Sequence, residues 1–446
     1  MSVARPHPKK KPLSARAVAL TALSRVELRD AYLNLTLDAL LDEHPLEPRD
    51  AAFVTELTYG ATRRRGQLDY AIKRFSDRGL DKLEDRVLAA LRLGAYQLFF
   101  MRTPKHAAVG GTVDALKELG LARATGFTNA ILRRLSELAS APLPPPGDDV
   151  EVAAIEHSHP EWLVRRWFQQ FGPERAKSML AADNEAPPLV LRANLARNSR
   201  DELLASMREA GLTVEPTPLS PAGIRVASPG RVEDLFGFSE GLWQVQDEAA
   251  QLVVQYAAAP KNATVLDVCA APGGKACQLA ETHQVLALDV HENRLRKILP
   301  EAKRLGVDAR LKTRKVDASK PLPEDLGEFD LVLVDAPCSG LGTLRRHPEL
   351  RWRIEEENLP QLRALQRSIL ESSQAAVKPG GLLVYAVCST DDSEGPDQIE
   401  PFLRSHPEFT AEPPPGQWPS WQGYLRTLPG PEGLDGFFAA RLRKLY

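Results

Sequence analysis

The sequence is poor in the features that mark secreted, membrane-bound and zinc-binding proteins. No apolar run approaches the ~20 residues that a membrane helix needs, and the N-terminal residues form no apolar signal core. The four cysteines include no Cys-x-x-Cys pair and accompany no histidine cluster, which argues against a structural zinc site. We therefore expect a cytoplasmic protein without membrane contact, in which the cysteines are free thiols and no metal is bound.

The remaining composition is that of an ordinary globular protein with an uneven distribution of charge. The chain has 446 residues, 43% hydrophobic and 26% charged, which is enough for two or three domains. Residues 1–140 carry 23 Lys and Arg against 16 Asp and Glu, whereas the rest carries 34 against 43. Basic clusters at Lys9–Lys11, Arg63–Arg65 and Arg133–Arg134 could contact nucleic-acid phosphates or could be solvated helix faces, and composition leaves both interpretations open.

The order of patterns along the chain predicts five segments. Residues 1–12 are basic and proline-rich and are predicted to be disordered. Helical spacing across 13–139 predicts an all-helical domain, and the four prolines of SAPLPPPGDD predict a linker at 140–150. Residues 151–240 combine a helical stretch with a small α+β segment, in which LVLRANL and GIRVAS are strands and DELLASMREAG is a helix. In 241–446, strands alternate with helix-length segments.

This alternation over 241–446 predicts a parallel, doubly wound sheet. The expected strands are TVLDVC, QVLALDV, RLKTRKV, FDLVLVD and GLLVYAV, and DGFFAARLRK is expected to add a final antiparallel strand. The turn DVCAAPGGKACQLAE places Gly273 and Gly274 where a ligand can approach the backbone before a helix begins. The turn lacks GxGxxG, and Pro272 suits a compact ligand better than a pyrophosphate, which disfavours NAD.

Four acidic residues follow four consecutive strands of this sheet. Asp267 ends the first strand and Asp289 the second, Asp317 follows the third, and Asp335 ends the fourth. Each could cap a helix, but together they line the edge where open α/β sheets bind ligands. Asp289 lies 22 residues after Asp267, where a carboxylate can accept hydrogen bonds from ribose hydroxyls, and Asp317 is placed to bind an adenine amino group.

The fourth strand runs into LVLVDAPCSG, which presents the carboxylate of Asp335 and the thiol of Cys338 three positions apart. The two could form a catalytic pair with Cys338 as the nucleophile, or they could be a helix cap and a buried small residue. The motif by itself does not decide between these interpretations.

Several motifs together resemble those of the RNA (cytosine-5)-methyltransferases that use S-adenosylmethionine. DVCAAPGGK, LDV, VDAS, DAPCSGLGTLRRHPEL and YAVCS occur in the family's order, after GLWQVQDEAAQLV. GATRRRGQLDYAI, LRLGAYQLFFMRTPKHAAVGGTVDALK and FTNAILRRL resemble a NusB-like RNA-binding domain, and this fusion is the arrangement of the RsmB/Sun family of bacterial 16S rRNA methyltransferases. The resemblance implies an all-α NusB-like N-terminal domain, a small α+β segment and an α/β Rossmann-like methyltransferase domain.

The resemblance also implies a reaction and a set of site residues. The reaction would convert cytosine to 5-methylcytosine in small-subunit rRNA, either naked 16S rRNA or a partly assembled subunit, with a monomer as the default state. Cys388 would be the nucleophile, Cys338 would assist product release, and Asp335 would contact the base and stabilise the adduct. The implied cofactor-binding residues are Cys269, Ala270, Ala271, Pro272, Gly273, Gly274, Lys275, Asp289, Asp317 and Asp335.

The implied chemistry explains why two thiols and an acid belong together. Cytosine C5 is too weak a nucleophile to take a methyl group from a sulfonium, so a thiolate adds to C6 and makes C5 enamine-like. An acid near N3 stabilises the adduct, which suits Asp335 if it carries or shares a proton. In the usual strand order 3-2-1-4-5, the strands before Cys338 and Cys388 are neighbours, so both thiols are expected in one crevice.

The other charged and sulfur-containing residues have simpler expected roles. The attacking thiol needs a lowered pKa, for which Lys275, Arg345 and Arg346 are the candidates by motif position. Cys269 ends a buried strand and Cys277 lies on the next helix, so both are expected to be small core residues.

Two departures from the family pattern and two alternative functions complete these expectations. Val387 stands where the family usually has threonine, and Gly395 stands where asparagine usually follows Glu394. These changes could alter the rate or the position of the base, but they leave the nucleophile in place. The alternatives are the same chemistry on tRNA, and a non-catalytic RNA-binding protein of ribosome assembly.

Overall fold

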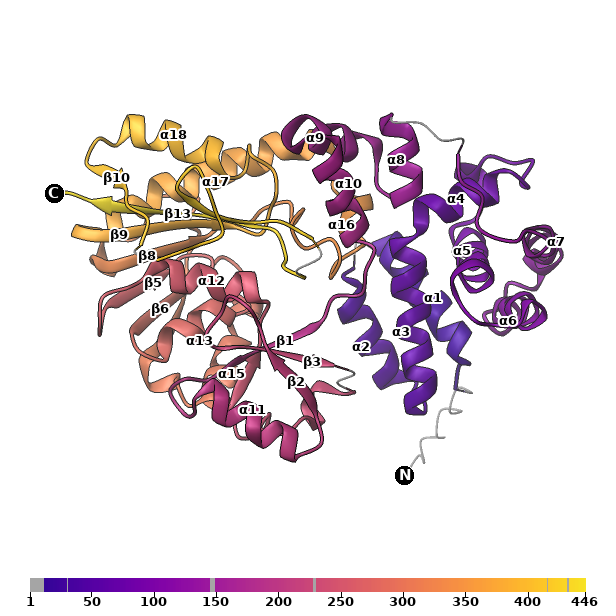
Figure 1. Ribbon diagram of the computed structural model, residues 1–446, viewed down its shortest axis with the longest axis horizontal. Helices are drawn as coiled ribbons and strands as arrows, with labels where there is room; N and C mark the ends of the chain where they lie inside the picture. The colour runs from indigo at the N-terminus through magenta and orange to yellow at the C-terminus, as the bar shows by residue number, and fades with distance from the viewer. Residues whose placement is uncertain (1–11, 30, 145–148, 228–229, 415, 431–432) are drawn as a thin grey trace, which may run out of the picture. The chain divides into compact units, whose positions relative to one another are not determined.

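The computed structural model divides the chain into two compact units (Figure 1). The first contains residues 1–184 and 347–353, and the second contains 185–346 and 354–446. The structure describes residues 12–29, 31–144, 149–227, 230–414, 416–430 and 433–446. The predicted tail, apart from Pro12, and part of the predicted linker lie outside these residues. No helix within them is long and apolar enough to cross a membrane.

The described part of the first unit is helical, as the spacing of its apolar residues predicts. Its helices are α1 (Ala15–Arg29), α2 (Leu33–Glu43), α3 (Pro48–Arg63), α4 (Arg65–Lys73), α5 (Asp85–Phe100), α6 (Lys105–Glu118), α7 (Thr125–Ser136), α8 (Val150–His157), α9 (Glu161–Phe171), α10 (Pro173–Ala182) and, from much later in the sequence, α16 (Leu350–Arg353). Residues Ala89 to Gln97 of α5 are all buried. A helix that is buried all round must be enclosed by others, and α5 contacts α1, α3, α4, α6 and α7.

A short segment from the second half of the sequence completes the first unit. Residues 347–353 follow the double arginine of LRRHPELRWR and belong to the helical unit. The Arg351 side chain is fully buried and donates hydrogen bonds to the carbonyl oxygens of Ser158 (3.2 Å) and Asp183 (2.9 Å). It also donates to Oδ1 of Asn184 (2.9 Å), while burial lowers its pKa to about 10. Arg351 is therefore a buried cation whose hydrogen bonds link residues 347–353 to the rest of the helical unit.

The second unit begins with a small antiparallel sheet. Its strands are β1 (Leu189–Ala193), β2 (Thr213–Pro216), β3 (Gly223–Ala227) and β4 (Trp243–Val245) in the order β2-β3-β1-β4, with α11 (Arg200–Glu209) packed against them. The predicted strands in LVLRANL and GIRVAS and the predicted helix in DELLASMREAG are confirmed, and a capping box of Ser199 and Glu202 begins the helix. The edge strands β2 and β4 were not predicted, because they are short and each keeps an exposed residue.

The larger sheet confirms the predicted doubly wound arrangement. Its strands are β5 (Thr264–Asp267), β6 (Gln284–Asp289), β7 (Leu311–Lys315), β8 (Phe329–Asp335), β9 (Val377–Val387), β10 (Phe409–Ala411), β11 (Ser420–Trp421), β12 (Tyr424–Thr427) and β13 (Phe437–Lys444). The parallel strands lie in the order β7-β6-β5-β8-β9, which is the expected 3-2-1-4-5 order. The predicted final strand, β13, pairs antiparallel with β9, and the short strands β10, β11 and β12 extend the sheet beyond it.

Helices cover both faces of this sheet (Figure 1), with a hydrophobic core beneath them on each face. The helices are α12 (Glu248–Ala257), α13 (Gly274–Ala280), α14 (Glu292–Leu295), α15 (Ile298–Leu305), α17 (Leu359–Ser373) and α18 (Pro396–Ser405). Along β9, Val384 and Ala386 pack with α12, α13 and α15, whereas Tyr385 and Val387 pack with α17 and α18. Because both faces are covered, ligands must approach the parallel strands at their ends.

Candidate active site

The carboxyl edge of the parallel strands gathers the four acidic residues. Asp267, Asp289 and Asp335 are the last residues of β5, β6 and β8, and Asp317 lies two residues beyond β7. Asp267 pairs with Ala287 of β6, so Asp289 lies two residues further along the neighbouring strand. Within the described residues, no group of three His, Cys, Asp or Glu side chains is placed to hold a metal ion.

Asp289 and Asp317 both accept hydrogen bonds within local turns. Asp289, which is 4% exposed, accepts from the backbone N–H groups of His291 (2.8 Å) and Ala271 (3.3 Å), so it ties the loop after β5 to the end of β6. Asp317 accepts from the hydroxyl (2.6 Å) and the N–H (3.1 Å) of Ser319, and these bonds lower the pKa of its carboxyl. Because a carboxylate offers about four lone-pair sites, both acids keep acceptors for a ligand.

Lys275 links the loop after β5 to the end of β8. Its Nζ lies 2.7 Å from Oδ2 of Asp335 and 5.2 Å from the centre of the Phe437 ring. Burial opposes the lysine charge, but the Asp335 carboxylate outweighs burial and, with smaller contributions from Cys388 and Asp267, raises the pKa of Lys275. The lysine is therefore a fixed cation that interacts with both the acid and the thiol.

Asp267 is a buried acid without a hydrogen-bond partner in the described part of the chain. It is 1% exposed, and neither of its carboxylate oxygens accepts a hydrogen bond. Burial, reinforced by Asp335, raises its pKa to about 8 in spite of the nearby Lys275. A buried polar group without a partner is a place where a ligand can supply one. At neutral pH the protonated acid at this edge is thus Asp267, whereas Asp335 lies in an ion pair with Lys275.

Cys338 and Cys388 meet at the ends of β8 and β9. Their Sγ atoms are 3.3 Å apart, and both side chains are partly exposed. Cys388 directly follows β9, Cys338 lies three residues beyond β8, and the pairing of Asp335 with Ala386 brings them together. The hydrogen bond to Cys388 and burial, followed by the charge of Glu394, raise the pKa of the Cys338 thiol well above its ordinary value. The Cys338 thiol therefore keeps its proton at neutral pH.

The other two cysteines are not placed to attack a substrate. Cys277 is fully buried in the core on the α13 face, and burial raises its pKa to about 12. Cys269 is partly exposed and packs against the core on the other face, and burial, with Asp267 next, raises its pKa. A thiol with a raised pKa is a poor nucleophile at neutral pH.

Arg345 and Arg346 are bound to two aspartates. Nε of Arg345 lies 2.7 Å from Asp435, and Nε of Arg346 lies 2.6 Å from the same carboxylate. Arg346 also lies 2.6 Å from Asp247, whose pKa is raised to about 6 by burial and then by Asp435. This cluster fixes the end of the loop that carries Cys338. Neither the sequence nor its spacing indicates Asp247 and Asp435 as partners, because they lie far apart along the chain.

Two glycines let three backbone segments pass close to Cys388. The Gly342 N–H donates to the Cys388 carbonyl (3.0 Å), and the Gly436 N–H donates to the Gly342 carbonyl (2.7 Å). A Cβ atom on Gly342 would lie 1.8 Å from the Gly436 oxygen. A side chain at Gly342 would therefore push the loop away from Cys388.

The two departures from the family pattern lie where they leave the thiols undisturbed. Val387 is fully buried in the core on the α17 face, so its side chain does not reach the edge where Cys388 lies. A Cβ atom on Gly395 would lie 3.0 Å from the ring of Phe438, so a larger residue there would require that ring to shift.

The arginine cluster of the helical unit is packed against aromatic rings. Each guanidinium of Arg63–Arg65 lies within 5.1 to 5.2 Å of a ring centre, and burial lowers the pKa of all three. The rings belong to Tyr59, Phe100 and Trp352. These arginines are thus packed against rings within the fold, with Arg63 buried and Arg64 and Arg65 partly exposed, and their contact with phosphates stays a prediction. Arg133–Arg134 are exposed, and Lys9–Lys11 lie outside the described residues.

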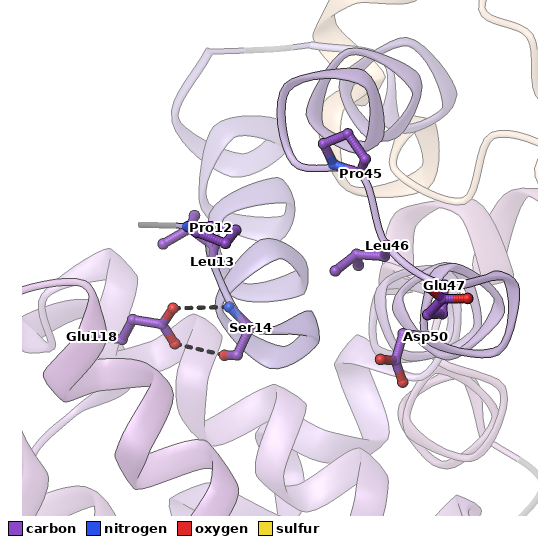
Figure 2. A pocket seen from close by; sticks show the side chains of 8 residues that line it. All are labelled: Pro12, Leu13, Ser14, Pro45, Leu46, Glu47, Asp50 and Glu118. Carbon is purple, nitrogen blue, oxygen red and sulfur yellow. Dashed lines mark hydrogen bonds between the residues drawn. The ribbon is translucent and has the colours of Figure 1, made fainter. Parts of the chain in front are cut away.

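A hollow of about 560 Å³ in the helical unit has acidic walls (Figure 2). Carboxylates of Glu47, Asp50 and Glu118 line it, together with Pro12, Leu13, Ser14, Pro45 and Leu46. Figure 2 shows Glu118 directed at Ser14, whose N–H and hydroxyl donate to it at 2.8 and 2.6 Å. Acidic walls repel phosphates, so this hollow is not an RNA site.

Family models match three successive parts of the chain. Residues 13–137 match the NusB family, residues 159–233 match the ferredoxin-like domain of RsmF/B-like methyltransferases, and residues 255–443 match the 16S rRNA methyltransferase RsmB/F family.

Curated relatives and solved structures match over most of the chain. Ribosomal RNA small subunit methyltransferase B of Klebsiella pneumoniae is 36% identical, over 98% of this chain and 99% of that protein. The probable ribosomal RNA small subunit methyltransferase B of a Synechocystis strain is 37% identical, over 97% and 100%. The crystal structure of PH0851 is 27% identical, covers 97% of this chain and 100% of its own, and has a TM-score of 0.84. A methyltransferase homologue from Pyrococcus horikoshii is also 27% identical, covering 66% and 98% with a TM-score of 0.58.

Proposed function

Because the chain belongs to the RsmB/F family of 16S rRNA methyltransferases, we propose that it transfers a methyl group from S-adenosylmethionine to C5 of a cytosine in small-subunit rRNA. The observation that carries the proposal is the 3.3 Å contact between Cys338 and Cys388, at the same sheet edge as the Lys275–Asp335 pair. The two thiols, the Asp335 carboxyl and the Lys275 cation could then all reach one cytosine ring.

The residues at the carboxyl edge fit S-adenosylmethionine. Asp289 would accept from the ribose hydroxyls and Asp317 from the adenine amino group, while the unpartnered Asp267 would gain a polar neighbour. Gly273, at φ +108°, brings the backbone into the loop where the methionine part would lie. When bound, S-adenosylmethionine supplies an electrophilic methyl group.

The protein's part in the reaction begins and ends at Cys388. Its thiolate forms a bond to C6, and the displaced π electrons are stabilised at N3 by a hydrogen bond from the Lys275 ammonium, which the Asp335 carboxylate holds in place. Once C5 carries a methyl group, it would lose its proton to solvent water, which reaches the partly exposed thiols. The C5–C6 double bond re-forms as the S–C6 bond breaks, and Cys388 leaves as a thiolate.

Cys338 is suited to assist this last step. Because its pKa is raised, it holds a proton at neutral pH, and its Sγ lies 3.3 Å from that of Cys388. A hydrogen bond from the Cys338 thiol stabilises the departing thiolate and so speeds the breaking of the S–C6 bond.

The test is methyl transfer to defined RNAs followed by nucleoside analysis. The enzyme is incubated with labelled S-adenosylmethionine and one of three substrates: naked 16S rRNA, a partly assembled small subunit, or tRNA. We expect labelled 5-methylcytidine from a small-subunit substrate. Label in another nucleoside would refute the cytosine chemistry, label from tRNA alone would refute the substrate, and no label from any substrate would leave a non-catalytic assembly role.

A further inference from the structure

Glu394 is a buried carboxylate between the two thiol-bearing loops. It is 0% exposed, and its Oε1 accepts hydrogen bonds from the Ser339 N–H (2.9 Å) and from Nε2 of Gln366 (2.9 Å). Its Oε2 accepts from the hydroxyl of Ser389 (2.6 Å) and from that of Ser339. These four donors fill the acceptor sites of the carboxylate, and charge-assisted bonds of this kind are among the strong ones.

The residues that Glu394 binds are the direct neighbours of the two thiols. Ser339 follows Cys338, and Ser389 follows Cys388. The two serine hydroxyls are themselves 3.2 Å apart, so one carboxylate spans the gap between the loops. The hydroxyl of Tyr385 on β9 donates to the backbone oxygen of Glu394 (2.6 Å), which anchors the glutamate to the sheet.

A neutral side chain could join two serines at less cost. A buried charge loses its hydration, and no Lys or Arg in the described residues forms an ion pair with Glu394. A buried anion that is held only by hydrogen-bond donors is uncommon, and such groups gather at functional sites. The position of Glu394 between the two thiol-bearing loops therefore calls for a reason beyond packing.

We propose that Glu394 is the positioning residue of the cysteine pair, which holds the loop after β8 to the loop after β9 and thereby sets the contact between Cys338 and Cys388. The proposal rests on the proposed cytosine chemistry, because that reaction requires both thiols to face one base. Glu394 acts through Ser339 and Ser389 and does not itself touch the substrate.

The charge of Glu394 has a second effect that a structural link would lack. It contributes to the raised pKa of Cys338, after the hydrogen bond to Cys388 and burial. The other titratable group that interacts with Cys338 is Tyr385, itself buried with a raised pKa, while Lys275 interacts with Cys388. Removing the negative charge should lower the pKa of Cys338, so that it loses its proton at a lower pH.

The experiment compares Glu394→Gln and Glu394→Asp with a matched control. Asp330→Asn serves as the control, because Asp330 lies near the other end of β8 and accepts hydrogen bonds from Thr264 and Lys378. Measurements are kcat over pH 6 to 10, the Kd of S-adenosylmethionine, and the amount of covalent RNA adduct on a denaturing gel.

Each variant has a distinct expected result. Glu394→Gln should lower kcat by about 10²-fold, as a displaced reacting group does, and leave the Kd within twofold. It should also accumulate adduct and shift the alkaline limb of the pH profile to lower pH. Glu394→Asp keeps the charge but shortens the link, so kcat should fall while the alkaline limb stays at its wild-type position. Asp330→Asn should match the wild type in all three measurements.

The outcomes separate this role from the proposed function. If wild-type enzyme forms 5-methylcytidine and Glu394→Gln matches Asp330→Asn in kcat and in pH profile, the role of Glu394 is refuted while the function stands. If the wild type forms no 5-methylcytidine, the proposed function is refuted and this role with it. Should Glu394→Gln not fold, Ser339→Ala and Ser389→Ala each remove one link, and wild-type kcat in both would refute the proposal.

Discussion

The unpartnered carboxyl of Asp267 should make the stability of the second unit depend on pH. Its pKa in the folded protein is about 8, against ~3.9 for an unfolded aspartate. Between these two pH values the folded state holds a proton that the unfolded chain has released, so the free energy of unfolding falls as pH rises. The loss of stability reaches its full size above pH 8. Asp267→Asn keeps the shape of the side chain and removes the titration.

The size of the effect follows from the two pKa values. At pH 7 the unfolded aspartate lies about three units above its pKa, and each unit corresponds to ~1.4 kcal/mol, which gives an upper bound of ~4 kcal/mol. The free energy of unfolding of Asp267→Asn, relative to wild type, should therefore rise by up to ~1.4 kcal/mol for each pH unit between pH 5 and pH 8.

Hydrogen exchange of the cofactor-free protein measures this difference where it arises. Opening free energies are taken from peptides of β5 and β8 between pH 5 and pH 8.5, with peptides of α5 as the internal reference. Asp330→Asn is the control, because the pKa of Asp330 is shifted in the opposite direction to that of Asp267. The pKa of Asp330 is lowered to about 2 by Lys378, so its contribution is present above the unfolded pKa and is lost only as pH falls toward 2. Its difference from wild type should stay constant from pH 5 to pH 8, and an equally constant difference for Asp267→Asn would refute the reasoning.

Three further predictions concern the two thiols, the buried Arg351 and the close backbone contact at Gly342. Cys388→Ala should abolish methylation, whereas Cys338→Ala should trap a covalent RNA adduct, visible as a slow gel band; the reverse pattern would exchange the two roles. Arg351→Met leaves four oxygens in the helical unit without this donor, at ~1–3 kcal/mol each, so urea unfolding followed by helical circular dichroism should show a lower midpoint; an unchanged midpoint would contradict a stabilising role for the buried arginine. Gly342→Ala, whose Cβ would meet the Gly436 oxygen at 1.8 Å, should lower kcat at least tenfold, an order-of-magnitude expectation for a displaced loop, while Gly430→Ala, whose Cβ has no neighbour nearer than 3.9 Å, should not.

The parts of the fold that were predicted have strong local signals. Every parallel strand except β7 contains a buried run, and an acid or a cysteine marks its carboxyl end. Strand order then brings Cys338 and Cys388 together, because neighbouring strands of a doubly wound sheet share an edge. The edge strands β2 and β4 have no such signal, since they are three or four residues long and partly exposed.

The parts of the site that were not predicted depend on contacts between distant segments. Glu394 can be named from the sequence as a position in a motif, but its four donors come from three separate segments, and nothing local distinguishes it from a surface glutamate. The same holds for Arg345 and Arg346. Their charge suggests that they lower the pKa of a thiol, but in the fold both bind Asp435, which lies 90 and 89 positions away along the chain. The burial of Arg351 in the helical unit likewise has no pattern in its own stretch of sequence.

The contact between the two sulfur atoms is symmetric, and the charges around it are not. Lys275, whose pKa is raised, interacts with Cys388, whereas the carboxylate of Glu394 interacts with Cys338. The Glu394 carboxylate therefore favours the protonated form of Cys338. An enzyme that attacked with the thiol after β8 would need the opposite arrangement, with the cation beside Cys338 and the anion beside Cys388. These charges support the proposal that the cysteine after β9 makes the attack, a choice that the 3.3 Å distance alone does not favour.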